Sequence, residues 1–360
     1  MFWNKKFFGL DISDFSLKVV QTHKTKEGFI ASAFGFYDIP EKIIEKGELK
    51  NEQVLSKLIL SCLKNSQGEG IKTKNVVCSL PEERSFVDVF RVPFIEEKEQ
   101  LEQIVLTEAE NRIPFPLSEV YYDFEVISDP KEVGNKKSSR EVILAACPKK
   151  IIDPYFNSLK RAGLFPLGME IESLAIARAI FSAKKVNAPT LIVDFGQNKT
   201  SFFVFSKKAV RLTSTVPCSA KMLTLSIAQS LKISTEKAKA LKEAEGLSGK
   251  QKGLEAMVPV LNELAEQIKA YLAYYKSHLS KNYPGEAIQN ISKLLLCGGG
   301  ANLKGLAEFL QEQLKMDVSL ANPLINFNLK IQAKKLKIKQ DKALSLTTAF
   351  GLSQKDVYED

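Results

Sequence analysis

The chain has 360 residues, of which 44% are apolar and 26% are charged, and its formal net charge is +9. These proportions are typical of folded globular proteins, and this length exceeds the usual size of a single core, so we expect two domains or two lobes about a cleft. No apolar run approaches the roughly 18–20 residues of a membrane span, and MFWNKKFF has too short an apolar run for a signal peptide. The five scattered cysteines contain no CxxC pair, which argues against a disulfide framework or a zinc site. The sequence therefore predicts a folded cytoplasmic protein with reduced, mostly buried cysteines.

The N-terminal segments alternate apolar and polar residues. FFGLDIS, LKVVQTHK and FIASAFGFYDIP predict three consecutive strands joined by hairpins. Apolar residues at helical spacing predict a helix over 51–65. The apolar run NVVCSLP predicts a buried strand that ends at Pro81.

The pattern changes from residue 84. FVDVFRVPF, VYYDFEVISD and EVILAACP predict strands, with the polar loop PKEVGNKKSSR between the last two. EKEQLEQIVLTEAENRI and KIIDPYFNSLKRAGL predict helices, the second ending near Gly163. We interpret this block as a small inserted module.

The segment TLIVDFGQNKTSFFVF repeats the opening pattern FFGLDISDFSLKVV, which is a weak internal repeat and predicts two related lobes facing a cleft. Helices are predicted over 222–231, 235–245 and 254–280. KLLLCGGGANLKGLAEFLQEQL then predicts a strand, a triple-glycine turn and a helix. The expected domains are a first lobe (1–83 and 165–188), an inserted subdomain (84–164), a second lobe (189–234 and 291–360) and its helical part (235–290).

The densest basic stretch is KIQAKKLKIKQDK at 330–342. Its alternation of lysine with Leu and Ile is typical of a solvated strand face, and a binding patch is the alternative. No RNA-binding aromatic motif accompanies it. We predict a strand and no nucleic-acid partner.

Three turns are candidates for chemistry, because DISDFSLK, DFGQNKTS and CGGGANLKG each follow an apolar strand. Two aspartates at strand ends can hold Mg²⁺ through its waters, and the amides and hydroxyls of such turns can hold phosphates. A triple glycine before a helix lets the backbone approach a ligand. Alone it is equally well explained as a tight structural turn. Together the three turns predict a nucleotide site.

The order and spacing of these turns resemble the actin-like ATPase superfamily, whose two phosphate motifs begin with Asp and whose adenosine motif is rich in glycine. CSLPEERSFVDVFRVP, AENRIPFPLSEVYYDFEVI and ALSLTTAFGLS resemble the PilM family of type IV pilus assembly proteins, relatives of the division protein FtsA. The likeness covers nearly the whole chain. It implies an α/β actin-like (ribonuclease H-like) fold, with two lobes facing a nucleotide cleft and a small α+β subdomain inserted in the first lobe.

The resemblance also implies that the protein binds ATP with Mg²⁺. The first phosphate motif falls on Asp11, Ser13, Asp14, Ser16 and Lys18. The second falls on Asp194, Gly196, Gln197 and Thr200. The adenosine motif falls on Gly298, Gly299, Gly300, Ala301, Asn302 and Leu303. Asp11 and Asp194 are the residues expected to hold Mg²⁺ through waters.

Two further pairs are candidates. Glu266 and Lys269 lie three apart on the polar side of the long helix, a spacing that lets both contact one ligand. The resemblance implies that this helix lines adenine and ribose. A solvated ion pair explains the two residues equally well. Glu170 and Glu172 lie between the lobes, where actin-like ATPases place a water-orienting side chain. As alternate residues of a strand they are expected on one face, and ordinary surface carboxylates are the alternative.

The sequence departs from the family pattern at four positions. Ser13 and Asp14 replace the Gly-Ser of the usual Asp-x-Gly-Ser, and Cys218 and Ser219 replace a frequent glycine pair. A side chain at position 13 can crowd the phosphates, and Asp14 adds negative charge there or helps to hold a cation. We therefore expect ATP binding with weak or absent hydrolysis. A nucleotide-free scaffold of the same fold is the alternative.

The resemblance implies a protein partner as well. In the PilM family the cytoplasmic tail of a PilN-like inner-membrane protein lies in a groove between the first lobe and the inserted module, and pilus motor ATPases are further contacts. The groove is expected at Phe90, Val92, Pro114, Phe115, Pro116 and Tyr121. This aromatic and proline content suits peptide capture. The alternative is that these side chains fill the core of the module.

Other functions are known on this fold. A small-molecule kinase needs a catalytic carboxylate in a substrate pocket, and only Glu170 and Glu172 qualify. An FtsA-like protein ends in an amphipathic membrane helix, whereas this chain ends in the short acidic SQKDVYED. Type II secretion and DNA-uptake machines share the platform. The leading expectation is a cytoplasmic, ATP-binding adaptor of the type IV pilus, associated with the membrane through its partner.

Overall fold

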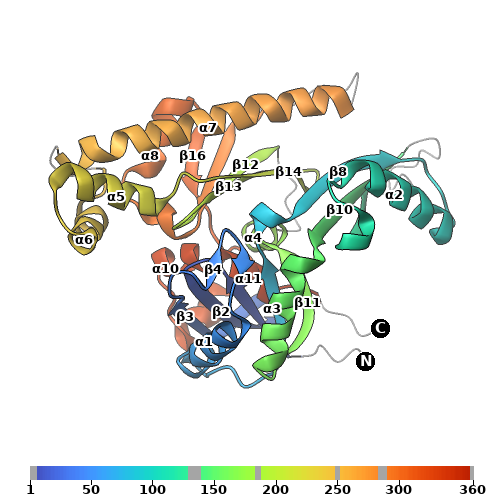
Figure 1. The fold of residues 1–360 in the computed structure, drawn as a ribbon, viewed down its shortest axis with the longest axis horizontal. Helices are drawn as coiled ribbons and strands as arrows, with labels where there is room; N and C mark the ends of the chain where they lie inside the picture. Colours follow the sequence, from blue (N-terminus) through green and yellow to red (C-terminus); the bar gives the residue numbers. More distant parts are fainter. Residues whose placement is uncertain (1–5, 129–138, 183–187, 248–251, 283–289, 357–360) are drawn as a thin grey trace.

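Two lobes lie against each other, and a smaller module stands beside them (Figure 1). The computed structural model describes residues 6–128, 139–182, 188–247, 252–282 and 290–356. Most of the polar loop at 130–140, the first five residues and the last four therefore lie outside the described residues. All five cysteines are buried and unpaired, as predicted.

The first lobe is built on a six-stranded sheet with the order β11-β7-β1-β2-β3-β6. Its strands are β1 (Phe8–Ile12), β2 (Ser16–Thr25), β3 (Gly28–Asp38), β6 (Gln67–Gly68), β7 (Asn75–Leu80) and β11 (Phe165–Ile171). The predicted hairpins join β1, β2 and β3 in antiparallel pairs. β7 and β11 add in parallel on the other side of β1, and the short β4 (Ile44–Glu45) and β5 (Glu48–Leu49) form a separate hairpin.

Helices cover both faces of this sheet (Figure 1). α1 (Glu52–Lys64) and α3 (Lys149–Arg161) pack together on one face. α4 (Glu172–Ile180) and α11 (Thr347–Ser353) pack on the other. Glycine makes this second contact possible, because a Cβ on Gly9 would lie 2.4 Å from the Ala349 carbonyl oxygen and one on Gly351 would lie 1.7 Å from that of Ala175.

The second lobe is a five-stranded sheet with the order β14-β13-β12-β15-β16. Its strands are β12 (Thr190–Phe195), β13 (Thr200–Ser206), β14 (Ala209–Val216), β15 (Lys293–Cys297) and β16 (Asp317–Leu320). Its helices are α5 (Ala220–Leu231), α6 (Thr235–Glu245), α7 (Lys252–Asn282) and α8 (Leu306–Leu314). α7 runs along the outside of the lobe, at the top of Figure 1, and buries Leu261, Leu264 and Ile268.

The C-terminal helices differ from the expected domain division, which placed all of 291–360 in the second lobe. α9 (Leu329–Lys335), α10 (Gln340–Ser345) and α11 follow β16, and Leu344, Leu346 and Phe350 are buried in the core of the first lobe. Asn326 fixes this return by donating hydrogen bonds to the carbonyls of Arg178 and Phe181. The chain therefore completes the first lobe after the second.

The strand predicted over 330–342 is wrong, because α9 occupies its first half. Asn328 caps the helix by accepting the Ile331 N–H. Gln332 is buried and exchanges hydrogen bonds with the backbone of Ala31 in β3. The alternation of lysine with apolar residues therefore reflects neither a strand nor a simple amphipathic helix.

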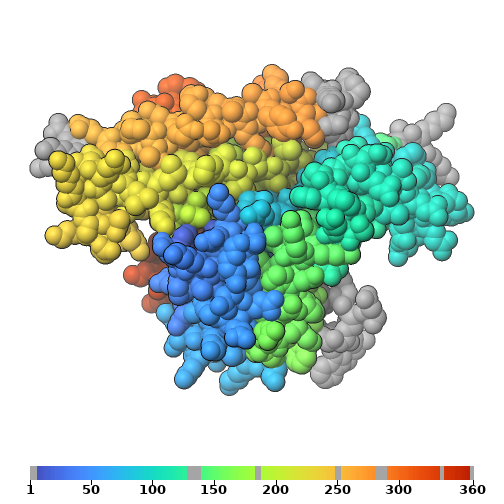
Figure 2. All heavy atoms as spheres, viewed as in Figure 1, coloured from blue at the N-terminus to red at the C-terminus, as the bar shows by residue number. Residues whose placement is uncertain are grey.

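The inserted module is a three-stranded sheet with the order β8-β10-β9, covered by one helix. Its elements are β8 (Phe86–Val92), α2 (Lys98–Arg112), β9 (Val120–Ser128) and β10 (Arg140–Pro148). The expected module ended at 164, but α3 packs in the core of the first lobe. Figure 2 shows the module, in teal, against the edge of the second lobe, where Arg211 of β14 and Glu141 of β10 form a buried ion pair of 2.9 Å.

Candidate functional site

A cavity of about 250 Å³ lies between the two lobes. The first lobe contributes Asp11, Ser13, Asp14, Phe15, Ser16, Lys18, Phe36, Asp38, Glu172, Leu344, Ser345, Thr347 and Thr348. The second contributes Asp194, Gly196, Gln197, Asn198, Lys199, Gly298 and Gly299. The three turns singled out in the sequence therefore converge on one cleft.

The first turn tolerates serine where the family pattern has glycine. Ser13 does not have a positive φ, so no glycine is required there. Its N–H donates to the carbonyl oxygen of Ser16 at 2.9 Å, and the two hydroxyls lie 2.9 Å apart. Ser13 thus closes the turn between β1 and β2.

Asp11 and Lys18 form an ion pair across the paired strands β1 and β2, with the carboxylate oxygen 2.9 Å from Nζ. Ser79 of β7 also donates to Asp11, at 3.3 Å. Burial opposes the charged ammonium, but the Asp11 carboxylate outweighs that cost and raises the pKa of Lys18. Lys18 is therefore a permanent positive charge at the first-lobe wall.

Asp194 is the penultimate residue of β12 and lies beside the glycine turn. Burial raises the pKa of its carboxyl, and the positive charge of Lys18 opposes that rise. Gly298 has φ +84°, and a Cβ there would lie 2.3 Å from Asp194 Oδ1. A Cβ on Gly300 would lie 2.7 Å from the Phe195 ring. Close packing of the turn on β12 thus accounts for these two glycines.

Asp14 does not act as an unpaired charge in the cleft. Its carboxylate accepts the backbone N–H groups of Lys46 and Gly47, at 3.2 and 3.0 Å, in the β4–β5 hairpin. It also accepts a hydrogen bond from Asn198 of the opposite lobe. The residue that departs from the family pattern therefore joins two elements of the cleft.

Glu172 is the buried acid of the cleft. Its Oε2 lies 2.9 Å from Lys199 Nζ, and Lys199 also pairs with Glu83. Burial raises the pKa of Glu172 to about 8, although Lys199 opposes the rise. A carboxyl of this kind, buried beside a polar cavity, can orient or deprotonate water.

Glu170 lies elsewhere, so the expectation that Glu170 and Glu172 share one face is wrong. β11 ends at Ile171, and Glu172 is the first residue of α4. Glu170 accepts hydrogen bonds from Arg178 at 2.7 Å and Lys355 at 3.3 Å. Although burial opposes it, Arg178 lowers the pKa of Glu170, which makes it a structural anion.

Several expected nucleotide contacts do not line the cleft. Glu266 and Lys269 form an exposed ion pair of 2.9 Å on α7, which matches the solvated alternative. Thr200 is fully buried and donates to the Cys218 carbonyl. Asn302 donates to the Asp341 carbonyl and so fastens α10. Gly300, Ala301 and Leu303 are also absent from the lining.

The sequence reasoning overlooked other lining residues. Asn198 and Lys199 stand inside the quoted DFGQNKTS, and Thr347 and Thr348 stand inside ALSLTTAFGLS. These four residues lie within the quoted segments, but at positions between those that the motifs single out.

The donor set suits a cation held through water. Among the described residues no group of three or more His, Cys, Asp and Glu side chains forms a direct metal site. Asp11 and Asp194 both face the cleft and influence each other electrostatically. Two carboxylates and space for waters are what Mg²⁺ accepts.

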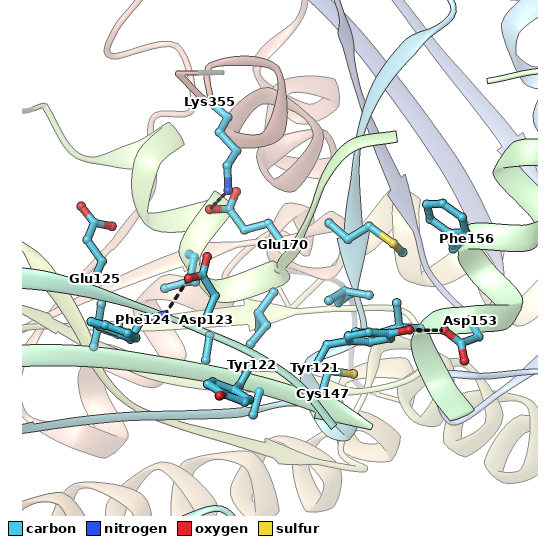
Figure 3. Close-up of a pocket in the computed structure, with 18 residues that line it drawn as sticks. Tyr121, Tyr122, Asp123, Phe124, Glu125, Cys147, Asp153, Phe156, Glu170 and Lys355 are labelled. Atoms are coloured by element: carbon cyan, nitrogen blue, oxygen red, sulfur yellow. Dashed lines mark hydrogen bonds and ion pairs between the residues drawn. The ribbon is translucent and has the colours of Figure 1, made fainter. Parts of the chain in front are cut away.

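A larger cavity, of about 510 Å³, lies between the module and the first lobe (Figure 3). It is bounded by β9, an edge strand of the module sheet, and by β11, an edge strand of the first-lobe sheet. Its apolar lining includes Leu80, Ile143, Ile152, Phe156, Met169, Ile171 and Leu174. Tyr121 donates to Asp153 at one end, at 3.2 Å, and Glu170 with Lys355 lies at the other. We call this cavity the module groove.

Only one of the six expected groove residues, Tyr121, lines the module groove. Phe90 and Val92 are buried in the module core, as the alternative stated. Pro114, Phe115 and Pro116 lie exposed in the turn after α2, outside the lining. The expected residues therefore lie mostly toward α2 and β8, whereas this cavity is bounded by the opposite edge of the module sheet.

None of the helices in the described part of the chain has the length and hydrophobicity needed to cross a membrane.

Comparisons with known proteins agree with this architecture. The cell division protein FtsA of Enterococcus hirae is 26% identical over 215 residues, which are 56% of this chain and 48% of that protein. The chain therefore spans about half the length of this relative. A structure described as a PilM–PilN type IV pilus biogenesis complex covers 99% of this chain and all of that one, with 22% identity and a TM-score of 0.80. MreB5 of Spiroplasma citri bound to AMPPNP covers 92% and 98%, with 11% identity and a TM-score of 0.52.

These likenesses show the actin-like ATPase fold with two lobes and a cleft. The family model of the type IV pilus assembly protein PilM matches residues 9–356, almost the entire chain. The chain therefore belongs to the PilM family of type IV pilus assembly proteins.

Proposed function

We propose that this protein is an ATP-binding adaptor of the type IV pilus assembly platform that captures the cytoplasmic tail of a PilN-like membrane protein in the module groove. Family membership supports the place in pilus assembly. The observation that carries tail capture is the module groove itself, an apolar cavity between two open sheet edges.

The cleft supports nucleotide binding. It joins two lysines, two turns with backbone and hydroxyl donors, and the carboxylate pair Asp11 and Asp194 in one cavity. The similar MreB5 structure is described as bound to AMPPNP. When Mg²⁺ is bound, it neutralises phosphate charge, and Asp11 and Asp194 would hold its waters.

A whole nucleotide requires more room than the cleft offers. The volume of the cleft, about 250 Å³, lies below the usual range for ligand pockets, about 300–1,000 Å³. Two contacts join the lobes: the hydrogen bond between Asn198 and Asp14, and the ion pair of 3.0 Å between Lys221 and Glu41. We infer that the lobes part when ATP enters.

The module groove supports capture of an extended peptide. An open strand edge offers backbone groups to an added strand, and pockets beside it take alternate side chains. On β9 the Phe124 N–H donates to the Asp123 carboxylate at 2.8 Å (Figure 3). This side chain caps the edge, and a bound strand would replace it. The similar solved complex is described as PilM–PilN.

The charge of the groove suits a tail that emerges from a membrane. Asp123, Glu125 and Asp153 are among its lining residues. Cytoplasmic segments next to membrane spans are rich in Lys and Arg, so an acidic rim complements them. In this proposal the protein is cytoplasmic and reaches the inner face of the membrane through its partner.

A peptide titration tests tail capture. The probe is a fluorescent synthetic peptide with the sequence of the cytoplasmic tail of a PilN-like protein from the same genome. We expect saturable binding that Phe156→Glu weakens at least about tenfold, because a charge enters the apolar lining. Phe115→Glu, on an equally exposed ring outside the lining, is the matched control. Absence of binding to the folded wild-type protein would contradict the proposal.

A further inference from the structure

Two of the residues that line the cleft within the described chain are cations, Lys18 and Lys199. Lys18 belongs to the first lobe and pairs with Asp11 of the same sheet. Lys199 belongs to the turn between β12 and β13 of the second lobe, but its ammonium group contacts first-lobe carboxylates, Glu172 and Glu83. Of these two lysines, Lys199 is the one that crosses the cleft.

The position of Lys199 is the phosphate end of the cleft. Its partner Glu172 lies close enough to Asp11 and Asp194 for both to affect its ionisation, and Lys199 in turn affects Asp194. These two aspartates are the residues that would hold a metal ion. An ammonium group beside them lies where the terminal phosphate of a nucleotide would carry its charge.

Lys199 is paired with two carboxyl groups, but its side chain is still partly exposed to solvent. Its side chain remains 21% exposed, and both of its partners are carboxylates on one side of the cleft. A flexible lysine is a point charge that donates hydrogen bonds to phosphate oxygens without strict geometry. If a phosphate replaces these two groups, the ammonium group of Lys199 still has an anionic partner.

We propose that Lys199 recognises the terminal phosphate and so makes the protein distinguish ATP from ADP. In the ATP-bound protein the γ-phosphate replaces Glu83 and Glu172 as the partner of the Lys199 ammonium group. This inference rests on the proposed binding of ATP. Glu83 lies in the short helical turn Glu82–Arg84 that leads into β8, the first strand of the module. Release of Glu83 from Lys199 therefore removes a contact next to the module.

The test is a titration of ATP and of ADP, each with Mg²⁺, into the wild type and into Lys199→Ala, Lys199→Gln, Lys199→Arg and Glu83→Gln. A lost charge-assisted hydrogen bond predicts that Lys199→Ala and Lys199→Gln weaken ATP binding on the order of ten- to a hundredfold. ADP affinity is expected to change by less than about threefold, because ADP lacks the group that Lys199 contacts. Lys199→Arg keeps the charge and should keep the preference for ATP.

Glu83→Gln separates recognition of phosphate from simple closure of the lobes. This variant removes a partner across the cleft but leaves the lysine available, so ATP affinity should stay the same or rise. If Glu83→Gln loses ATP affinity as Lys199→Ala does, or if Lys199→Ala weakens ATP and ADP equally, Lys199 only joins the lobes. Absence of ATP binding in the wild type would overturn the proposed function itself, and unaffected ATP binding in the lysine variants would overturn this inference alone.

Discussion

Asp14 of the first lobe and Asn198 of the second lobe are hydrogen-bonded across the cleft, with 2.8 Å between the carboxylate oxygen and the amide nitrogen. The same carboxylate accepts two backbone N–H groups of the β4–β5 hairpin. The charge that the sequence places in the first phosphate turn is therefore already satisfied by protein donors. It shapes the cleft and does not point an uncompensated charge at a ligand.

Replacement of Asp14 by serine, the residue of the usual family pattern, should affect stability more than nucleotide binding. Three hydrogen bonds to a buried carboxylate are lost, so we expect Asp14→Ser to lower the free energy of unfolding by about 1–3 kcal/mol. Chemical denaturation measures this change, and ATP affinity should remain within a few fold of the wild type. Loss of ATP binding at unchanged stability would show that Asp14 contacts the ligand or its metal.

The glycine turn offers a matched pair of substitutions. Gly298→Ala introduces a Cβ 2.3 Å from Asp194 Oδ1 at a positive φ, whereas a Cβ on Gly299 meets Ser345 Oγ at 3.4 Å. We expect Gly298→Ala to cost roughly 1 kcal/mol or more in the free energy of unfolding and to displace Asp194. Gly299→Ala should leave stability almost unchanged. Thermal unfolding of the two variants compares them directly, and equal melting temperatures would contradict the role of Gly298.

We expect Glu172 to take up protons when ATP binds. Burial raises its pKa to about 8 even while Lys199 opposes the rise. Once Lys199 turns to phosphate, the pKa of Glu172 rises further, so the group takes up part of a proton at about pH 8 and above. Calorimetric titration of ATP in buffers of different ionisation enthalpy measures this uptake. The uptake should vanish in Glu172→Gln, and uptake of the same size in that variant would assign it to another group.

Local structure was largely predictable from the sequence. α6 matches its predicted bounds, and Ser234 caps it by accepting the Lys237 N–H. The periodicity of α7 and the strand, glycine turn and helix of β15 and α8 follow from short-range patterns. The alternation at 330–342 misled because this segment is not a solvated strand face: Gln332 within it is buried and donates a hydrogen bond to the Ala31 carbonyl of β3.

Tertiary placement was less predictable. Nothing in the local pattern shows that Phe350 returns to the first lobe or that Glu172 starts a helix while Glu170 lies within a strand. The module groove combines β9, β10, α3, β11 and Lys355, which are remote in sequence. The motif residues converge on the cleft, but the partners that hold them, such as Glu83 for Lys199, come from unmarked positions.

The most direct test of the account is a titration of ATP and Mg²⁺ into nucleotide-stripped protein, beside Asp194→Ala and the control Asp317→Ala, an exposed aspartate at the start of β16. The account predicts Mg²⁺-dependent binding in the wild type and the control, and loss of that binding in Asp194→Ala. Binding that is indifferent to Mg²⁺ and to Asp194 would contradict the assigned site. No binding to the folded wild type would contradict the account and leave an actin-shaped scaffold without a nucleotide.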